Sequence, residues 1–350
     1  MSKKTKLLLQ QSLSLLADSQ RASIVVIALW TLCLLSVFTV TLGSGVRQKL
    51  VLIKRLDERD RMRGILDSAV KKAILQIKKE EQKGADTLAD GWSTDAPAFK
   101  DIPLEDGEFS VAYPYQDEIT GSLTIRYGLI DEESKININT AKRGVLERLF
   151  SMVLDMNAVE SQELAAAIVD WRDADSFLSI PLGSAEDAYY KGLSYPYEAK
   201  DADFESLDEA LLVKGMRSDI FEKIKKYITV YGQARVNINT TSKIVLLALG
   251  LSEKVVNDIM LFRAGPDGVM GTKDDGVFDG EVSITQRLSQ RYPLSEAEAA
   301  ELTVVSEYYL TTYSSAFMAQ ASAWLHNRKY SGSVVSVINR QGKILYWHEV

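Results

Sequence analysis

An apolar run, SIVVIALWTLCLLSVFTVTLG, covers residues 23–43 and holds no charged residue over its 21 positions. A helix needs about 20 such residues to cross the hydrocarbon core of a bilayer. A buried core helix is the alternative, but such helices usually keep a polar stripe. A cleaved secretory signal fits less well, because its apolar region usually has about 7–15 residues. The pattern therefore predicts a transmembrane helix over residues 23–43.

The apolar pattern continues past this run with the spacing i, i+3, i+4, i+7, which is typical of one helix face. The positions that follow it are Met62, Ile65, Leu66, Ala69, Val70, Ala73, Ile74 and Ile77. Gly84 and the stretch 90–103, DGWSTDAPAFKDIP, end the pattern. We predict one helix from about residue 23 to about residue 83, anchored in lipid at its start and packed on a core at its end.

Strand-like patterns flank a long helical middle region. Residues 108–115 (EFSVAYPY) and 121–130 (GSLTIRYGLI) are rich in β-branched and aromatic residues, and QDEITG between them predicts a hairpin turn. Residues 139–310 carry mostly helical patterns. Strand patterns return at 315–327, 332–340 and 343–350. A helical block that interrupts a sheet indicates an α domain inserted into an α+β domain.

Two phrases repeat at a spacing of 100 residues: KININTAKRG at 135–144 and RVNINTTSKI at 235–244. Each alternates apolar and Asn residues like a strand. Asn139 or Thr140 can then cap the helix that follows the first phrase, and Asn239 or Thr240 the helix that follows the second. After each phrase come a helix, a short turn and a second helix that ends in an arginine, Arg172 or Arg263. We interpret them as two copies of one helix-hairpin-helix unit.

Helix-hairpin-helix units often bind nucleic acid, so this function must be weighed. A divergent third pair covers 206–228, and the three turns read LDMNAVES, VKGMRSD and LGLSEKV, each with at most one usable Gly. Binding a phosphate backbone takes a glycine-rich turn whose amides approach closely. The net charge is −7, and residues 1–22 carry +3 from four basic residues and one acidic residue, so the rest carries −10. An acidic body repels phosphate, and we expect a scaffold that binds no nucleic acid.

Few residues suit catalysis or transition-metal binding. The chain has one cysteine, Cys33, and two histidines, His326 and His348. An intramolecular disulfide is impossible, and a zinc site or a Ser/His triad lacks its usual ligands. We therefore expect no enzyme.

An acidic stretch, DWRDADSFLSIPLGSAEDAYY, covers residues 170–190. Its carboxylates are Asp170, Asp173, Asp175, Glu186 and Asp187. Paired carboxylates can perform acid–base chemistry, but neither a nucleophile nor a histidine nor a phosphate loop accompanies them. We expect a solvated loop or a pairing with Arg172.

The loop 265–280, GPDGVMGTKDDGVFDG, combines acidic residues with five glycines. Its carboxylates are Asp267, Asp274, Asp275 and Asp279. Hard oxygen ligands on a flexible loop suit Ca²⁺, which takes 6–8 oxygens at variable geometry. The spacing does not match an EF-hand, and Asp-Gly clusters also make ordinary turns. The residues alone leave both interpretations open.

Several motifs in one order resemble the K-type minor pseudopilins of type II secretion systems (the GspK family), over nearly the whole chain. The motifs are RASIVVIALWTLCLLS, DEESKININTA, DWRDAD followed by GSAEDAYY, FESLDEALLVKGM, YITVYGQARVNINTTS, GPDGVMGTKDD and GKILYWHE. The resemblance implies a pseudopilin fold of the α+β class. In this fold a long N-terminal transmembrane helix lies on a small antiparallel sheet. A large inserted α domain with helix-hairpin-helix (SAM-like) repeats interrupts that sheet.

This resemblance divides the chain into five parts. Residues 1–22 form a prepilin leader, 23–43 the transmembrane part of the helix, and 44–138 the helix continuation and first strands. Residues 139–310 form the inserted α domain with the calcium loop, and 311–350 form the C-terminal strands.

The resemblance further implies a non-enzymatic structural protein at the tip of the periplasmic pseudopilus, which helps to initiate assembly for export of folded proteins. The implied partners are the I-, J- and H-type minor pseudopilins, the major pseudopilin, the prepilin peptidase, the inner-membrane assembly platform, and lipid around 23–43. Cleavage by the peptidase aligns with Ala22 and Ser23, although Gly is usual before the cut. The fifth residue after the cut is Ile27, where most pilins have Glu and the K type lacks it. The family also supports calcium at the 265–280 loop.

Orientation follows from the resemblance alone, since the N-terminal flank of the span has four Lys and Arg and residues 47–63 have seven. The family implies a single-pass inner-membrane protein of a Gram-negative bacterium, with a cytoplasmic N-terminus and a periplasmic body. Two other functions stay open: a membrane-anchored DNA receptor of the competence type, and a membrane-tethered hydrolase that uses the acidic clusters.

Overall fold

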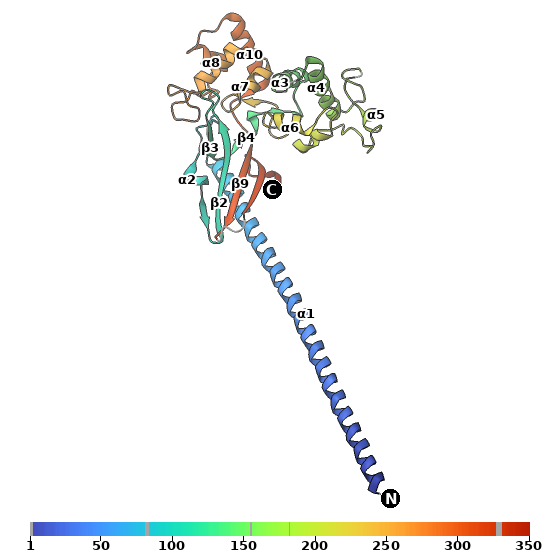
Figure 1. Cartoon of the computed structure of the whole chain (residues 1–350). Coiled ribbons are helices and arrows are strands. Elements are labelled where there is room, and N and C mark those ends of the chain that lie inside the picture. The colour runs from blue at the N-terminus through green and yellow to red at the C-terminus, as the bar shows by residue number, and fades with distance from the viewer. Residues whose placement is uncertain (1–2, 81–83, 155, 182, 327–330) are drawn as a thin grey trace. The chain divides into compact units, whose positions relative to one another are not determined.

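The computed structural model describes residues 3–80, 84–154, 156–181, 183–326 and 331–350, and side chains from residue 24 onward (Figure 1). The chain forms two compact units, Met1–Arg61 and Met62–Val350. Helix α1 (Lys3–Lys79) begins in the first unit and ends in the second. It starts before the predicted residue 23, because residues 3–22 contain neither Gly nor Pro and are rich in Leu, Lys and Gln, which favour helix.

The first unit carries the apolar run. Over Ile24–Lys79, α1 has an 18-residue window with a mean hydropathy of 2.5 and none of it buried. Among the described residues it is the one helix with the length and composition to cross a membrane. The hydroxyls of Ser36, Thr39 and Thr41 donate to carbonyls four residues earlier, so that their polar groups are satisfied within the helix.

The second unit contains a seven-stranded antiparallel sheet of order β1-β2-β9-β10-β11, with β3 paired to β2 and β4 paired to β9. The strands are β1 (Ile102–Leu104), β2 (Gly107–Gln116), β3 (Leu123–Tyr127), β4 (Ile130–Asp131), β9 (Ala316–Leu325), β10 (Ser331–Asn339) and β11 (Ile344–Glu349). Burial alternates along β9, because successive side chains point to opposite faces of a sheet. The strands predicted at both ends of the helical region are confirmed.

The C-terminal part of α1 packs on this sheet through small residues. Ala69 and Ala73 are fully buried in one apolar cluster with alanines of β9. A Cβ added at Gly107 of β2 would lie 2.9 Å from the Ile65 side chain, and one at Gly332 of β10 would lie 2.9 Å from Met62. Small residues on both surfaces therefore allow a close approach of helix and sheet.

A second apolar core lies in the elements between β4 and β9. The helices are η1 (Glu132–Ser134), α3 (Arg143–Val153), α4 (Ala158–Arg172), α5 (Asp187–Tyr190), η2 (Leu207–Leu212), α6 (Ser218–Ile224), α7 (Lys243–Leu249), α8 (Glu253–Arg263), α9 (Ile284–Ser289) and α10 (Glu296–Tyr309), and α2 (Ala96–Phe99) precedes β1. Two short parallel pairs join β5 (Ile136–Asn137) to β6 (Ile228–Thr229) and β7 (Val236–Asn237) to β8 (Leu310–Thr311).

These elements confirm the predicted α+β class, with a long N-terminal helix and an antiparallel sheet. The helix-hairpin-helix type of the repeats and the five domain boundaries stay predictions. In the divergent pair at 206–228, the first helix is the six-residue 3-10 helix η2. It ends before Gly215, whose φ of 84° no helix continues.

Each repeated phrase contains the sequence Asn-Ile-Asn-Thr (the NINT phrase, residues 137–140 and 237–240), and the two copies make the same contacts. In the first, Asn139 Nδ2 donates to Phe204 O (3.0 Å), and its Oδ1 accepts from Phe204 N (2.8 Å). In the second, Asn239 makes both bonds with Phe278, each at 2.9 Å. Each asparagine side chain thus pairs with the backbone of a distant segment in the way that a peptide group would. Neither side chain caps the helix that follows it.

The two predicted arginines also have equivalent roles. Arg172 Nη2 at the end of α4 donates to Ala141 O at 2.5 Å, and Arg263 Nη1 at the end of α8 donates to Thr241 O at 2.5 Å. The acceptor is in each case the residue directly after the NINT phrase. Each unit is therefore closed by a bond from its last helix to its first turn.

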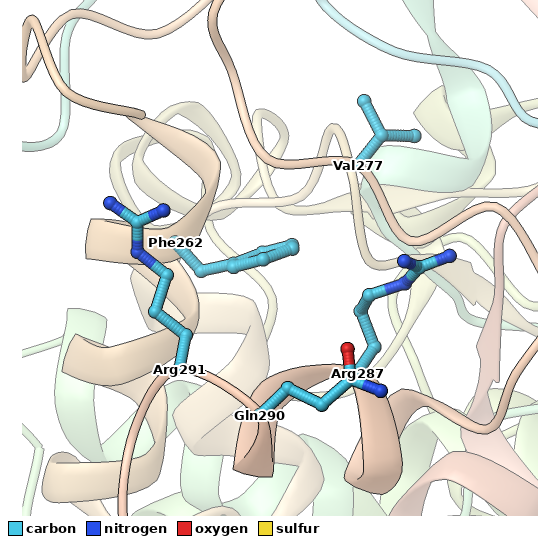
Figure 2. A pocket seen from close by; sticks show the side chains of 5 residues that line it. All are labelled: Phe262, Val277, Arg287, Gln290 and Arg291. Atoms are coloured by element: carbon cyan, nitrogen blue, oxygen red, sulfur yellow. The ribbon is translucent and has the colours of Figure 1, made fainter.

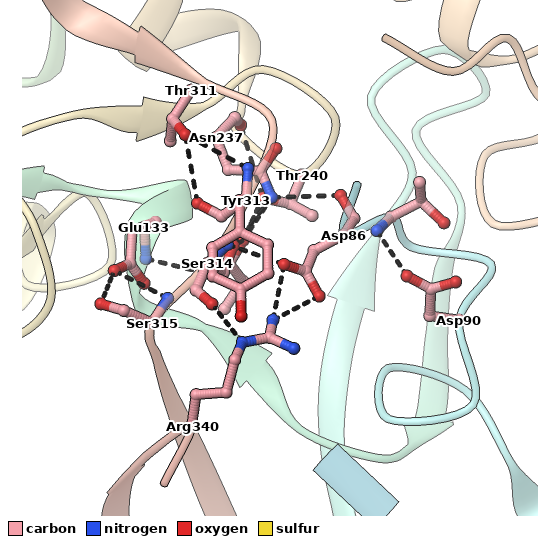
Figure 3. Close-up of polar contacts among 12 residues, drawn as sticks. Asp86, Asp90, Glu133, Asn237, Thr240, Thr311, Tyr313, Ser314, Ser315 and Arg340 are labelled. Atoms are coloured by element: carbon pink, nitrogen blue, oxygen red, sulfur yellow. Dashed lines mark hydrogen bonds and ion pairs between the residues drawn. The ribbon is translucent and has the colours of Figure 1, made fainter. Parts of the chain in front are cut away.

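A buried polar network joins the sheet to the inserted elements (Figure 3). The Asp86 carboxylate accepts two bonds of 2.6 Å from Arg340 Nη2, and both side chains are buried. The Glu133 carboxylate accepts from the backbone N–H groups of Ser315 (3.0 Å) and Ala316 (3.1 Å). The network fixes the points at which the chain leaves the sheet and returns to it.

Replacement of the second asparagine of either phrase by alanine is expected to cost about 1–3 kcal/mol of stability, because the Phe204 or Phe278 backbone groups lose their partners in a buried place. Chemical denaturation of the full chain in detergent would measure this for Asn139→Ala and Asn239→Ala. The exposed Asn257→Ala serves as the control and should change stability by about 0.5 kcal/mol at most. Losses no larger than the control's would show that these bonds contribute little.

Candidate functional site

Three carboxylates converge in the loop that follows α4. Asp173 caps the C-terminus of α4, Asp175 lies two residues further, and Glu186 precedes α5. One oxygen of each lies within 4.8 Å of the others, and they are the one such group of acidic, His or Cys ligands among the described residues. Asp175 Oδ1 also accepts a bond from Phe177 N (2.8 Å), which holds the Asp-x-Asp turn.

No salt bridge to this group is formed among the described residues, although the nearby charge of Arg172 acts to lower the pKa of Asp173. Glu186 is 6% exposed, yet its Oε1 is buried without a hydrogen-bond partner, and so is Asp173 Oδ1. The expected pairing with Arg172 is not formed, because that guanidinium donates to Ala141 O. Burial, followed by the charges of Asp170 and Asp173, raises the pKa of Glu186 to about 7. Burial and neighbouring aspartates likewise raise the pKa of Asp173.

An arrangement of this kind suits a hard divalent cation. Carboxylate oxygens are the ligands that Ca²⁺ prefers, and a cation would remove the repulsion that raises these pKa values. Acid–base catalysis has less support, because no nucleophile or histidine accompanies the carboxylates. The sequence places Asp173, Asp175 and Glu186 in one acidic stretch with Asp170 and Asp187, but it did not single these three out as a metal site. The signal was an Asp-x-Asp at a helix end together with a Glu at the next helix start.

The loop 265–280 holds the four calcium ligands predicted from sequence: Asp267, Asp274, Asp275 and Asp279. Asp274 Oδ2 accepts from Asp267 N (3.1 Å), and Asp275 Oδ2 accepts from Gly271 N (2.7 Å). Thr272 Oγ1 donates to both Asp274 (2.6 Å) and Asp275 (3.1 Å). These bonds link Asp274 and Asp275 through Thr272, but among the described residues no three of the four carboxylates bring ligand oxygens within 4.8 Å of one another.

The fourth aspartate of that loop has a different partner. Asp279 forms an ion pair with Arg287 of α9, which lowers the pKa of this carboxyl. The loop is fixed to the hairpin of β2 and β3, because Met270 N donates to Asp117 Oδ2 (3.3 Å) and Arg126 Nη2 donates to Met270 O (2.5 Å). Its calcium role stays a prediction.

The helix turns that could meet a phosphate are occupied by carboxylates of the chain itself. Between α3 and α4, Asn157 N donates to Glu160 Oε2 (3.1 Å) in a capping box. Between α7 and α8, Ser252 N donates to Glu301 of α10, and Gly250 N donates to Leu247 O (3.0 Å). A backbone N–H that already donates to a carboxylate has no hydrogen bond left to donate to a phosphate, and the carboxylate repels the phosphate. This geometry argues against nucleic-acid binding at both turns.

Comparisons with known proteins agree with one another. A family model described as "Type II secretion system (T2SS), protein K" matches residues 126–233, which include the three clustered carboxylates. "Type II secretion system protein K" of Aeromonas hydrophila is 27% identical over 211 residues, 55% of this chain and 58% of the relative. Its namesake of Pectobacterium carotovorum subsp. carotovorum is 25% identical over 191 residues, 55% and 56% of the two chains. The matches thus span little more than half of each relative.

The fold has a solved counterpart. A chain of "The Crystal Structure of the GspK-GspI-GspJ complex from enterotoxigenic Escherichia coli Type 2 Secretion System" superposes with a TM-score of 0.64 at 18% identity. The match covers 85% of this chain and 98% of that one. At this identity it shows the fold. Sequence motifs, family model, curated relatives and fold all point the same way: over residues 126–233 the chain matches the type II secretion system protein K family, and it resembles the members of that family.

Proposed function

We propose that this protein is a structural minor pseudopilin that caps the tip of the type II secretion pseudopilus and helps to initiate its assembly. The observation that carries the proposal is the inserted set of elements between β4 and β9. A subunit with so large an insertion on one end of its sheet leaves little room for another subunit to stack there. Its role is architectural and involves no catalysis.

The apolar span supports the same position. Ile27 stands where a pilin subunit usually has a glutamate that neutralises the N-terminal ammonium of its neighbour. A lone carboxylate inside lipid is costly. A subunit at the end of a filament has no such neighbour above it, so an apolar residue suits that place. The cleavage site Ala22–Ser23 lies outside the residues whose side chains the structure describes, and processing there is part of this proposal.

The partners follow from the family and the assembly role. The solved relative comes from a complex whose title names GspK, GspI and GspJ, and we extend this partnership to the I-, J- and H-type subunits of the present system. The major pseudopilin, the prepilin peptidase and the assembly platform of the inner membrane complete the set. The N-terminus lies in the cytoplasm, residues 23–43 cross the inner membrane, and the body lies in the periplasm.

Calcium is the second part of the proposal. The site at Asp173, Asp175 and Glu186 fits a hard cation, because two of its buried oxygens lack partners. The loop 265–280 is the alternative location, with Asp267, Asp274, Asp275 and Asp279 as ligands. A bound cation would order the loop between α4 and α5 and supply the positive charge that the carboxylates lack.

Co-purification tests the assembly role. The full chain in detergent, mixed with I- and J-type pseudopilins and Ca²⁺, is expected to give one complex with a single copy of each subunit by size exclusion with light scattering. A capping subunit occupies the one position at the tip of the complex. An excess of the chain should therefore add no further copy to the complex. Absence of any complex, or several copies of this chain in a stack, would contradict the tip model.

Melting temperatures test the calcium proposal. A ligand present at about a hundredfold its Kd stabilises by about 2.7 kcal/mol, so Ca²⁺ is expected to raise Tm by several degrees over chelator. Asp175→Asn, which keeps an acceptor for Phe177 N, should abolish the rise if the carboxylate cluster binds the ion. Loss of the rise in Asp274→Ala, Asp275→Ala instead would place the ion in the 265–280 loop. An equal Tm with Ca²⁺ and with chelator would contradict calcium binding at both locations.

The pKa of Glu186 gives a separate test without metal. It rises from 4.5 to about 7 on folding, so the folded state holds the proton more tightly and stability falls as pH rises from about 4.5 to about 7. Glu186→Gln cannot ionise and escapes this loss. In chelator it should match the wild type at pH ~4.5 and be about 1–3 kcal/mol more stable at pH ~8. Denaturation curves measure both.

The exposed Glu307→Gln is the matched control for that comparison and should follow the wild type at both pH values. With Ca²⁺ present, the advantage of Glu186→Gln should disappear, because the ion needs the carboxylate. An advantage that does not grow with pH would show that Glu186 ionises normally in the folded protein.

A further inference from the structure

A cavity of about 600 Å³ lies among the inserted helices (Figure 2). Its lining residues are Phe262, Val277, Arg287, Gln290 and Arg291. Phe262 belongs to α8 and Arg287 to α9, Gln290 and Arg291 directly follow α9, and Val277 lies in the loop before it. The volume falls within the range of about 300–1,000 Å³ that small-molecule sites occupy.

The walls of this cavity carry one uncompensated positive charge. Arg287 is neutralised by its ion pair with Asp279, although its Nε is buried without a hydrogen-bond partner within the described residues. Arg291 is exposed, and its side chain has neither an ion pair nor a hydrogen bond in the part of the chain that the structure describes. An anion with a single charge would balance the lining and satisfy unused guanidinium N–H groups.

An apolar surface lies beside these donors. The Phe262 side chain lies between the two arginine side chains in Figure 2, and Val277 lines another side. The ring is held in place, because it packs on the Phe278 ring with centroids 4.7 Å apart, and Phe262 O accepts a bond from Gly276 N (3.1 Å). The lining therefore combines a packed aromatic ring with an arginine side chain on either side of it.

We infer that this cavity binds a carboxylate carried on an apolar or aromatic group. The planar guanidinium matches a carboxylate with paired hydrogen bonds, and the Gln290 amide can add another donor. A phosphate dianion fits less well, because the lining has one net positive charge and Asp279 would repel the second negative charge. Two sources offer this chemistry: the C-terminal residue of a polypeptide and a free organic acid. The inference is independent of the assembly role.

Fluorescence anisotropy of a labelled peptide, measured with the full chain in detergent micelles, tests whether the cavity binds such a carboxylate. The probe is fluorescein-Gly-Gly-Phe with a free C-terminal carboxylate, and the comparison is the same peptide with a C-terminal amide. Saturable binding of the acid and at least tenfold weaker binding of the amide are expected. Equal binding of the two peptides, or binding of neither, would overturn the inference. Phenylacetate then separates the sources: competition shows that a free acid suffices, and its failure to compete assigns the site to polypeptide ends.

Two variants tie the binding to this cavity. Arg291→Gln removes the unpaired charge at an exposed position and should weaken binding of the free acid about tenfold or more. Arg235→Gln makes the same change at another exposed position and should leave the affinity unchanged. Both should keep the wild-type melting temperature. Equal affinities of Arg291→Gln and the wild type would place the peptide elsewhere and overturn the inference.

Discussion

The buried carboxylate of Asp131 is the contact on which the arrangement of sheet and inserted elements depends. Its oxygens accept bonds from Glu133 N (2.8 Å), Asn237 Nδ2 (3.1 Å), Thr240 Oγ1 (2.5 Å) and Ser314 Oγ (2.7 Å). Burial and the charge of Glu133 raise the pKa of this group above its usual range. All four donors are neutral, so hydrogen bonds and not an ion pair hold this carboxyl group in place. Asp131 itself ends β4, and its donors come from η1, from the second NINT phrase and from the residues just before β9. This shared acceptor explains why these segments meet at one point.

The sheet and the helix packed on it could be predicted from sequence because their signals are local. Alternation along β9 specifies a face that must be buried, and the stripe from Met62 to Ile77 specifies the helix face that covers it. The network around Asp131 could not be predicted, since three of its four donors lie 106, 109 and 183 residues away. A polar residue inside a strand pattern looks the same whether it is buried or solvated.

The repeat was visible in sequence, but its mechanism was not. The phrase suggested that its second Asn or the following Thr caps a helix. Instead, Asn139 and Asn239 bind the backbones of Phe204 and Phe278. The acidic site was underestimated for a similar reason. Asp173 and Glu186 are 13 positions apart, and only the turn of the chain after α4 brings their oxygens within 4.8 Å. The sequence indicated the residue types, but only the fold shows that their carboxylate oxygens lie close together.

The two repeats place an acidic loop directly after the arginine that closes each unit, and the loops have different electrostatics. After Arg172, two buried carboxylate oxygens stay without partners. After Arg263, Asp274 and Asp275 accept bonds from their own loop, and Asp279 is paired with Arg287. The second loop satisfies its own carboxylates, whereas the carboxylates of the first loop repel one another, and the proposed cation would remove this repulsion. The duplicated framework therefore carries two acidic loops, and the first is the one whose charge the proposed cation would balance.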